Sequence, residues 1–150
     1  MKNMQMKKIL IKALIAAAIM TNSSMTYAQT IFSKPFNTVH GTAPFSKIDD
    51  SQWMPAIDAG IEQAKAEVEA IATQKAEPDF ANTIEALENT GRALDRVLNV
   101  FYPLMSADAS DAMMEIDMEA SAKLSDYSTW LILNEQLWQR VKAVYDRRDS

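Results

Sequence analysis

The chain has 150 residues, enough for one domain with a hydrophobic core, and 48% of them are apolar against 23% charged. This composition excludes an intrinsically disordered protein, and few glycines and prolines with ten methionines favour helix over sheet. The net charge of −5 opposes non-specific binding to nucleic acid or anionic lipid, because both need a basic surface. We therefore expect an all-α fold and no nucleic-acid partner.

Residues 1–28 have the layout of a secretory signal peptide. Three lysines precede an apolar run at 9–20, and a short polar segment ends at Ala28, where we expect cleavage. The apolar run is too short for a transmembrane helix, which needs about 20 residues. An N-terminal anchor or amphipathic helix is the alternative interpretation of this segment.

Cleavage after Ala28 has consequences for charge and location. It removes four lysines and no acidic residue, so the net charge falls from −5 to −9. The chain has no cysteine, which excludes both a lipoprotein anchor and disulfides. We expect an exported protein that is periplasmic or secreted and does not bind the membrane after signal cleavage.

Residues 29–49 are predicted to form an extended arm, because they contain Pro35, Gly41 and Pro44 and show no sustained period. Three phenylalanines are expected to anchor the arm on a larger body: Phe32, Phe36 and Phe45. His40 is the chain's one histidine, and without any cysteine it cannot make a typical zinc site.

Residues 50–150 are predicted to form a helical region of four helices, the first over about 51–74. Asp50 or Ser51 is the expected N-cap, and Pro78 excludes helix at its predecessor. The apolar positions of the first helix form one stripe: Trp53, Ile57, Ile61, Ala64, Val68 and Ile71.

The second helix is predicted over about 80–104, with Asp79 as N-cap and Phe80 entering the core. Its apolar stripe continues without a miss through Gly91, and it widens near the C-terminal end. We interpret Gly91 as a point of close approach by a partner helix; a functional hinge is the alternative. Members of the stripe are Ile84, Leu87, Gly91, Leu94, Leu98, Phe101 and Met105.

The third and fourth helices are predicted over about 110–132 and 135–148, with Asn134 capping the fourth. Leu133 and Trp138 are spaced for a hydrophobic staple, and Tyr145 continues the apolar stripe of the fourth helix. The last residues carry no glycine cap or proline stop, so we expect the chain to be truncated before a further domain.

No catalytic or metal-binding motif is present, so we predict no catalytic, cofactor-binding or metal-binding residue in this chain. His-Glu-x-x-His, Gly-x-Ser-x-Gly and the glycine-rich phosphate loops are all absent. Acidic pairs such as Glu85 with Glu88 lie on polar helix faces and are interpreted as solvated surface. Three methionines are interpreted as core residues rather than metal ligands: Met113, Met114 and Met118.

Several segments carry a family resemblance in a consistent order. The segment Glu77-Pro-Asp-Phe-Ala-Asn-Thr-Ile-Glu-Ala-Leu-Glu-Asn-Thr-Gly resembles the N-terminal region of the thimet oligopeptidase family of zinc metallopeptidases, which includes bacterial peptidyl-dipeptidases and oligopeptidase A. Segments at 41–48, 54–57, 68–72 and 133–145 resemble the family as well. The central match departs from the family pattern at Asp79 and Ala81. The matching positions are Pro78, Phe80, Asn82, Thr83, Ile84, Ala86, Leu87, Glu88, Thr90 and Gly91.

The resemblance implies the N-terminal part of a larger, mostly helical enzyme that hydrolyses short peptides and releases dipeptides from their C-termini. It implies zinc in the full-length enzyme, held in a missing C-terminal catalytic domain, and none in this fragment. The helices of relatives form one wall of a substrate channel, and we expect the same of this chain. The alternative is a stand-alone periplasmic helical bundle that binds a protein or peptide.

Overall fold

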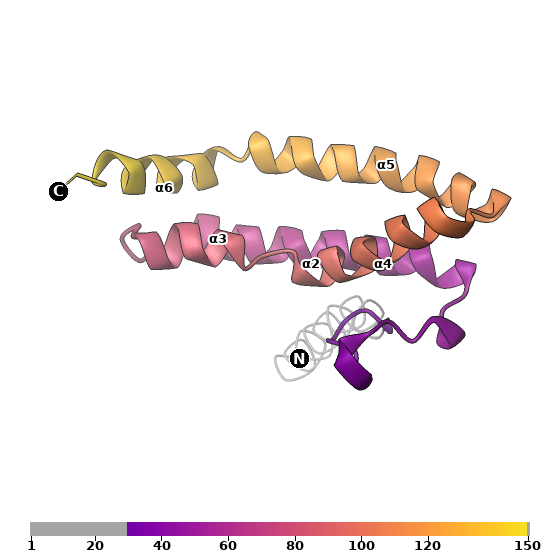
Figure 1. The fold of residues 1–150 in the computed structure, drawn as a ribbon. Coiled ribbons are helices and arrows are strands. Elements are labelled where there is room, and N and C mark those ends of the chain that lie inside the picture. The colour runs from indigo at the N-terminus through magenta and orange to yellow at the C-terminus, as the bar shows by residue number, and fades with distance from the viewer. Residues whose placement is uncertain (1–29, 150) are drawn as a thin grey trace, which may run out of the picture.

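The computed structural model describes residues 30–149, so the predicted signal peptide at 1–28 lies outside the described residues. The predicted all-α class is confirmed: from residue 30 to residue 149 every regular element is a helix. Figure 1 shows three antiparallel passes, in which α2 runs out, η4, α3 and α4 return, and α5 with α6 run back over them. Helix α2 is the centre of the array, because it contacts α4, α5 and α6.

Helix α2 spans Trp53–Thr73, and it buries all six residues of its predicted apolar stripe. Its N-terminal cap differs from the prediction, which named Asp50 or Ser51. A 3₁₀ turn, η3 (Asp50–Gln52), precedes α2, and Asp49 caps that turn in a reciprocal capping box with Gln52. Asp49 takes this role because its extended backbone and carboxylate can accept the N–H of Ser51 at 3.0 Å.

The predicted continuous helix over 80–104 is wrong. The segment contains a π-helical turn η4 (Phe80–Glu85), one turn of α-helix α3 (Ala86–Glu88), a turn, and α4 (Arg92–Asp108). The Asn89-Thr90-Gly91 triplet ends the first part, since the side chains of Asn89 and Thr90 donate to the carbonyls of Glu85 and Leu87. Gly91 then takes φ +73°, the left-handed conformation that glycine adopts freely.

Gly91 is therefore a turn residue and not the site of close helix approach that the sequence predicted. A Cβ on Gly91 would have Ala64 Cβ as its nearest neighbour at 3.8 Å, which is ordinary contact. The close approach is at Gly60 of α2, where an added Cβ would lie 2.8 Å from the Cα of Leu94. The Gly91 N–H donates to Glu67 Oε2 at 2.8 Å, so α2 also supplies an acceptor at the start of α4.

Helix α5 spans Asp111–Ile132 and α6 spans Glu135–Asp146. Ser110 caps α5 by accepting from Met113 N–H, and Asn134 caps α6 by accepting from Leu137 N–H, as predicted for Asn134. The expected staple pair is mostly exposed, with Leu133 at 73% and Trp138 at 58%. The other segments with short helical turns are η1 (Val39–Gly41) and η2 (Phe45–Lys47), both in the arm.

The arm is anchored by two of its three phenylalanines. Phe32 is fully buried against Trp53, with ring centroids 5.3 Å apart, and Phe36 packs edge-on to Phe32 at 5.9 Å. Trp53 in turn meets Phe101 of α4 edge-on at 5.3 Å, which continues a row of aromatic rings into the core. Phe45 is 58% exposed, so its predicted role as an anchor is wrong here, because its 3₁₀ turn lies outside this row.

From residue 30 to residue 149, every helix is too short or too polar to cross a membrane.

The two glycines predict different costs for an added methyl group. Gly60→Ala should lower the free energy of unfolding by about 2–3 kcal/mol, because the Cβ meets the backbone of Leu94 and α2 must move away from α4. Gly91→Ala should cost about 1–2 kcal/mol, because only the left-handed backbone is strained. Urea denaturation followed by circular dichroism measures both; a Gly91→Ala cost above that of Gly60→Ala would contradict this assignment.

Candidate functional site

The described residues contain few groups suited to catalysis. Between residues 30 and 149, no three His, Cys, Asp or Glu side chains lie close enough together to hold a metal ion. His40 is exposed in η1, with φ +59°, and belongs to no such cluster. Of the three methionines predicted as core, only Met113 is buried; Met114 and Met118 are 46% and 70% exposed, because they lie on the outer face of α5.

Among the described residues, three ionisable side chains have shifted pKa values: Tyr102, Tyr127 and Lys123. Burial raises the pKa of the Tyr127 phenol, with a further contribution from the negative charges of Glu67 and Asp95. Burial likewise raises the pKa of Tyr102. These groups stabilise the contact of α5 with α2 and α4 and do not form a catalytic set.

Lys123 and Asp58 connect α5 to α2 by an ion pair. The Lys123 ammonium donates to the two carboxylate oxygens of Asp58 at 2.7 and 2.9 Å, and it also pairs with Glu119 at 3.1 Å. These hydrogen bonds, first that with Asp58, raise the pKa of Lys123. Because both side chains are 36% exposed, we interpret the pair as fixing the register of two helices and expect little net stabilisation from it.

A buried arginine is the most distinctive polar feature of the fold. Arg140 of α6 is only 7% exposed, yet none of the described carboxylates pairs with it. Its guanidinium instead donates to the carbonyls of Gln74 and Ala76 at 3.1 and 3.0 Å and to Asn82 Oδ1 at 2.9 Å. Thr83 Oγ1, at 3.4 Å, is the fourth acceptor, and we call these four acceptors the arginine socket. Among the described residues the buried Nε of Arg140 has no acceptor, so the socket binds the two terminal nitrogens of the guanidinium. A planar fork with several fixed donors suits such a socket better than a lysine would.

The socket fixes the link between α2 and η4. Residues 74–79 carry no regular structure, so their carbonyls need partners from elsewhere. Arg140 binds two of these carbonyls, and Arg147, the residue that follows the last residue of α6, donates to Pro78 O. The Gln74 side chain donates to Ile71 O and Asn82 O at 3.2 and 2.8 Å, which joins the end of α2 to η4.

Asn82 of the family-like motif is the centre of this network. Its side-chain oxygen accepts from Asp79 N–H, from Thr83 Oγ1 and from Arg140, and its amide nitrogen donates to Glu77 O. Asp79 accepts from Asn82 N–H at 2.7 Å, so the predicted N-cap is confirmed. The motif residues Asn82 and Thr83 therefore point inward and accept hydrogen bonds from the Arg140 guanidinium. Thr83 is fully buried.

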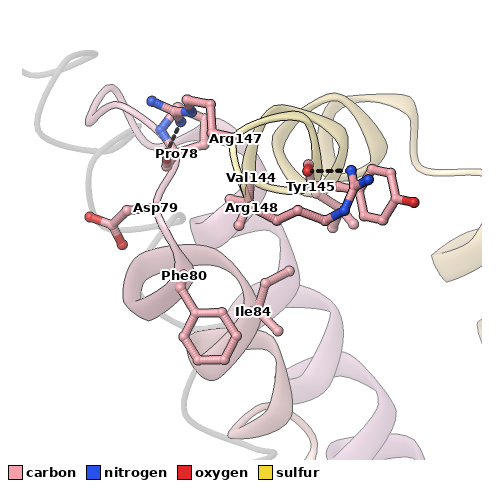
Figure 2. Close-up of a pocket in the computed structure, with 9 residues that line it drawn as sticks. Pro78, Asp79, Phe80, Ile84, Val144, Tyr145, Arg147 and Arg148 are labelled. Carbon is pink, nitrogen blue, oxygen red and sulfur yellow. Dashed lines mark hydrogen bonds between the residues drawn. The ribbon is translucent and has the colours of Figure 1, made fainter. Parts of the chain in front are cut away.

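The inward position of Asn82 and Thr83 explains why Phe80 does not enter the core as predicted. Phe80 is 66% exposed and lies on the outer side of η4. Tyr145, predicted to continue a buried stripe, is 60% exposed on α6. Figure 2 shows both side chains at a groove between η4 and α6.

This groove, the 80/145 groove, has a volume of about 620 Å³ and mainly apolar walls. At its rim Arg147 donates to Pro78 O, and Arg148 donates to Tyr145 O while its guanidinium lies 4.0 Å from the Tyr145 ring centroid (Figure 2). The lining residues are Pro78, Asp79, Phe80, Ile84, Val141, Val144, Tyr145, Arg147 and Arg148. The groove has the chemistry of a binding surface and contains no nucleophile or general base in catalytic geometry.

Sequence reasoning identified the motif but did not identify the socket or the groove. Arg140 lies in the family-like segment at 133–145, but a charged side chain on a surface helix is normally solvated, so the sequence analysis did not single it out. Its position three residues after the buried Leu137 was the available signal, since residues at i and i+3 share a face.

The arginine socket predicts that Arg140 cannot be replaced by lysine or by an apolar residue of similar length. Arg140→Lys and Arg140→Met should each lower the free energy of unfolding by about 2–4 kcal/mol, because buried carbonyl and amide oxygens lose their donors. Arg148→Lys, at an exposed position two residues after the end of α6, is the control and should cost under about 0.5 kcal/mol. Urea denaturation gives all three values; equal costs at positions 140 and 148 would refute the socket.

The shifted phenols predict a loss of stability in alkaline solution. Tyr102 and Tyr127 keep their protons to higher pH in the folded chain than in the unfolded chain, where the pKa is 10.0. Their contribution to stability is therefore complete below about pH 10 and is lost as the pH rises through the folded pKa values. The Tyr102→Phe/Tyr127→Phe double variant should lose less thermal stability than the wild type as the pH rises above about 10. If the wild type and the double variant lose thermal stability identically with pH, the two phenols do not cause the alkaline loss of stability.

Comparison with known proteins gives the motif a family context. The chain is 41% identical over 106 residues to the dipeptidyl carboxypeptidases of Salmonella typhimurium LT2 and Escherichia coli K12, a match that covers 71% of this chain and 16% of each relative. It is 29% identical over 118 residues to oligopeptidase A of Escherichia coli K12, covering 79% of this chain and 17% of that relative. No protein-family model matches the chain.

The chain thus spans about one sixth of the length of the curated relatives it matches. The matched part is the N-terminal part of those relatives, in agreement with the family that the motif at 77–91 indicated. Over these residues the chain belongs to the family of the dipeptidyl carboxypeptidases and oligopeptidase A.

Proposed function

We propose that this chain is the N-terminal, non-catalytic part of an exported zinc metallopeptidase that cleaves short peptides and releases dipeptides from their C-termini. The observation that carries the proposal is the 41% identity to dipeptidyl carboxypeptidases over 106 residues. The weaker 29% identity to oligopeptidase A makes C-terminal dipeptide release the preferred activity over internal cleavage.

Catalysis then belongs to parts of a longer polypeptide. The residues from 30 to 149 do not fit a zinc site, because no group of metal-ligating side chains forms there and the chain has one histidine and no cysteine. In the peptidases this chain resembles, zinc activates a bound water and polarises the scissile carbonyl. We assign that chemistry to residues outside these 150 and derive no step through His40.

The role proposed for this chain is part of the wall of the substrate channel. Its three antiparallel passes form an elongated slab, and the outer faces of α5 and α6 expose large apolar side chains that a stand-alone domain would bury. The exposed large apolar residues of α5, of α6 and of the link between them are Met114, Met118, Ile132, Leu133, Trp138 and Tyr145. These faces favour a larger body over the stand-alone bundle.

The activity is tested with the complete gene product. The reading frame should continue past Ser150 and encode His-Glu-x-x-His, and the purified full-length protein should release C-terminal dipeptides from N-acetylated peptides of about five to eight residues. Amidation of the peptide C-terminus should abolish this release. Removal of zinc by a chelator should abolish activity, and adding zinc back should restore it.

Three results would each reject part of this proposal. A stop codon directly after Ser150 in the natural gene would leave the helical-bundle alternative. Cleavage that is unaffected by C-terminal amidation would indicate an endopeptidase of the oligopeptidase A type. Peptide hydrolysis by the 150-residue chain alone would contradict the assignment of catalysis to other residues.

Export is tested by locating the mature N-terminus. In a Gram-negative host, the protein should appear in the periplasmic fraction with Gln29 as its first residue, because residues 1–28 have signal-peptide layout. Ala28→Leu should block cleavage, since signal peptidases require a small residue there, and the uncleaved form should stay with the membrane. Recovery of wild-type protein in the cytoplasm with Met1 intact would disprove export.

A further inference from the structure

The 80/145 groove leaves aromatic and aliphatic side chains exposed at one end of the molecule. Phe80 and Tyr145 are 66% and 60% exposed, and Ile84, Val141 and Val144 lie half-buried behind them. Exposed aromatic side chains around a concave apolar surface of about 620 Å³ are typical of a surface that another segment covers. We propose that an apolar segment of the same polypeptide, downstream of Ser150, occupies the 80/145 groove in the full-length protein.

The position of the groove favours this occupant. Arg147 and Arg148 form part of the groove wall (Figure 2), so in the longer polypeptide proposed above the residues that follow them start beside the groove. A segment tethered at the edge of its own binding surface has a high effective concentration there and needs little intrinsic affinity. The inference rests on the proposed function, since it requires the additional length seen in the relatives.

The walls of the groove are held in place by interactions already described. The arginine socket fixes the start of η4 relative to α6, and Arg147 connects α6 to Pro78. The groove is therefore largely pre-formed, and its occupant gains affinity without first ordering its walls.

The chemistry of the lining indicates the composition of the occupant. Two arginines and one aspartate line the rim, so an apolar segment with a neutral or acidic flank is complementary. The rim polar groups already bond within the protein, as Arg147 does with Pro78 O and Arg148 with Tyr145 O. A substrate peptide would need main-chain partners, whereas a packed apolar segment needs mainly side-chain contact.

Thiol labelling of the full-length protein tests the proposal, because the 150 residues contain no cysteine to interfere. Phe80→Cys and Tyr145→Cys place a thiol in the groove, and Glu135→Cys is the control at an exposed position of the same helix α6. Each variant is treated with a maleimide in native buffer and in urea, and tryptic peptides are quantified by mass spectrometry. The ratio of the two rates gives the protection of each position.

The expected result is labelling at positions 80 and 145 that is at least about tenfold more protected than at position 135. Equal labelling at all three positions would show an open groove and overturn the proposal. Protection that appears only after adding a peptide substrate, or that rises with protein concentration, would assign the groove to substrate or to a second copy instead. If position 135 is protected as strongly as positions 80 and 145, the whole of α6 is covered in the full-length protein. That result would also reject the groove as a specific docking site.

Peptidase activity of the unsubstituted full-length protein is measured in the same experiment. An active enzyme with an open groove would retain the proposed function and reject only the docking segment. An inactive protein with a protected groove would reject the proposed function and retain the docking segment. The two failures can therefore be distinguished.

Discussion

The structure depends on the placement of one buried cation. Arg140 has no carboxylate partner among the described residues, and it is stabilised by carbonyls of the irregular link after α2 and by the side chain of Asn82. Burying a guanidinium is costly unless its donors find acceptors, so these acceptors must stay in place. This requirement connects three segments far apart in the chain: the end of α2, the π-helical turn η4 and helix α6. The shape of the 80/145 groove follows from the same connection.

The same constraint explains the family-like motif without invoking catalysis. Asp79 and Asn82 form a reciprocal cap at the start of η4, and Thr83 is fully buried beside the guanidinium. Further along the motif, the Asn89-Thr90-Gly91 triplet ends the helix and turns the chain into α4. In this chain the motif builds a fixed junction between η4 and α6. Its residues hold the helices in position, and the proposed peptidase chemistry belongs to other parts of a longer protein.

Much of the fold could be predicted from the sequence, and the failures have physical causes. The stripe of α2 and the caps at Asp79 and Asn134 were predictable because they depend on local spacing and on short-range side-chain bonds. The break at residues 89–91 was missed because the apolar period continues across it from Leu87 to Leu94. Burial of Thr83 in place of Phe80 could not be predicted, because it depends on Arg140, which lies 57 residues away in the chain. The groove was missed for the same reason, since its walls meet only in the folded chain.

The central claim is that Arg140 and Asn82 form one structural unit. A double-mutant cycle with Arg140→Met, Asn82→Leu and the combined variant measures their coupling in the free energy of unfolding. The account predicts a coupling of about 1–3 kcal/mol, because once either partner is removed the second substitution costs much less. Additive costs, with a coupling below about 0.3 kcal/mol, would show that the two residues act independently and would contradict the account.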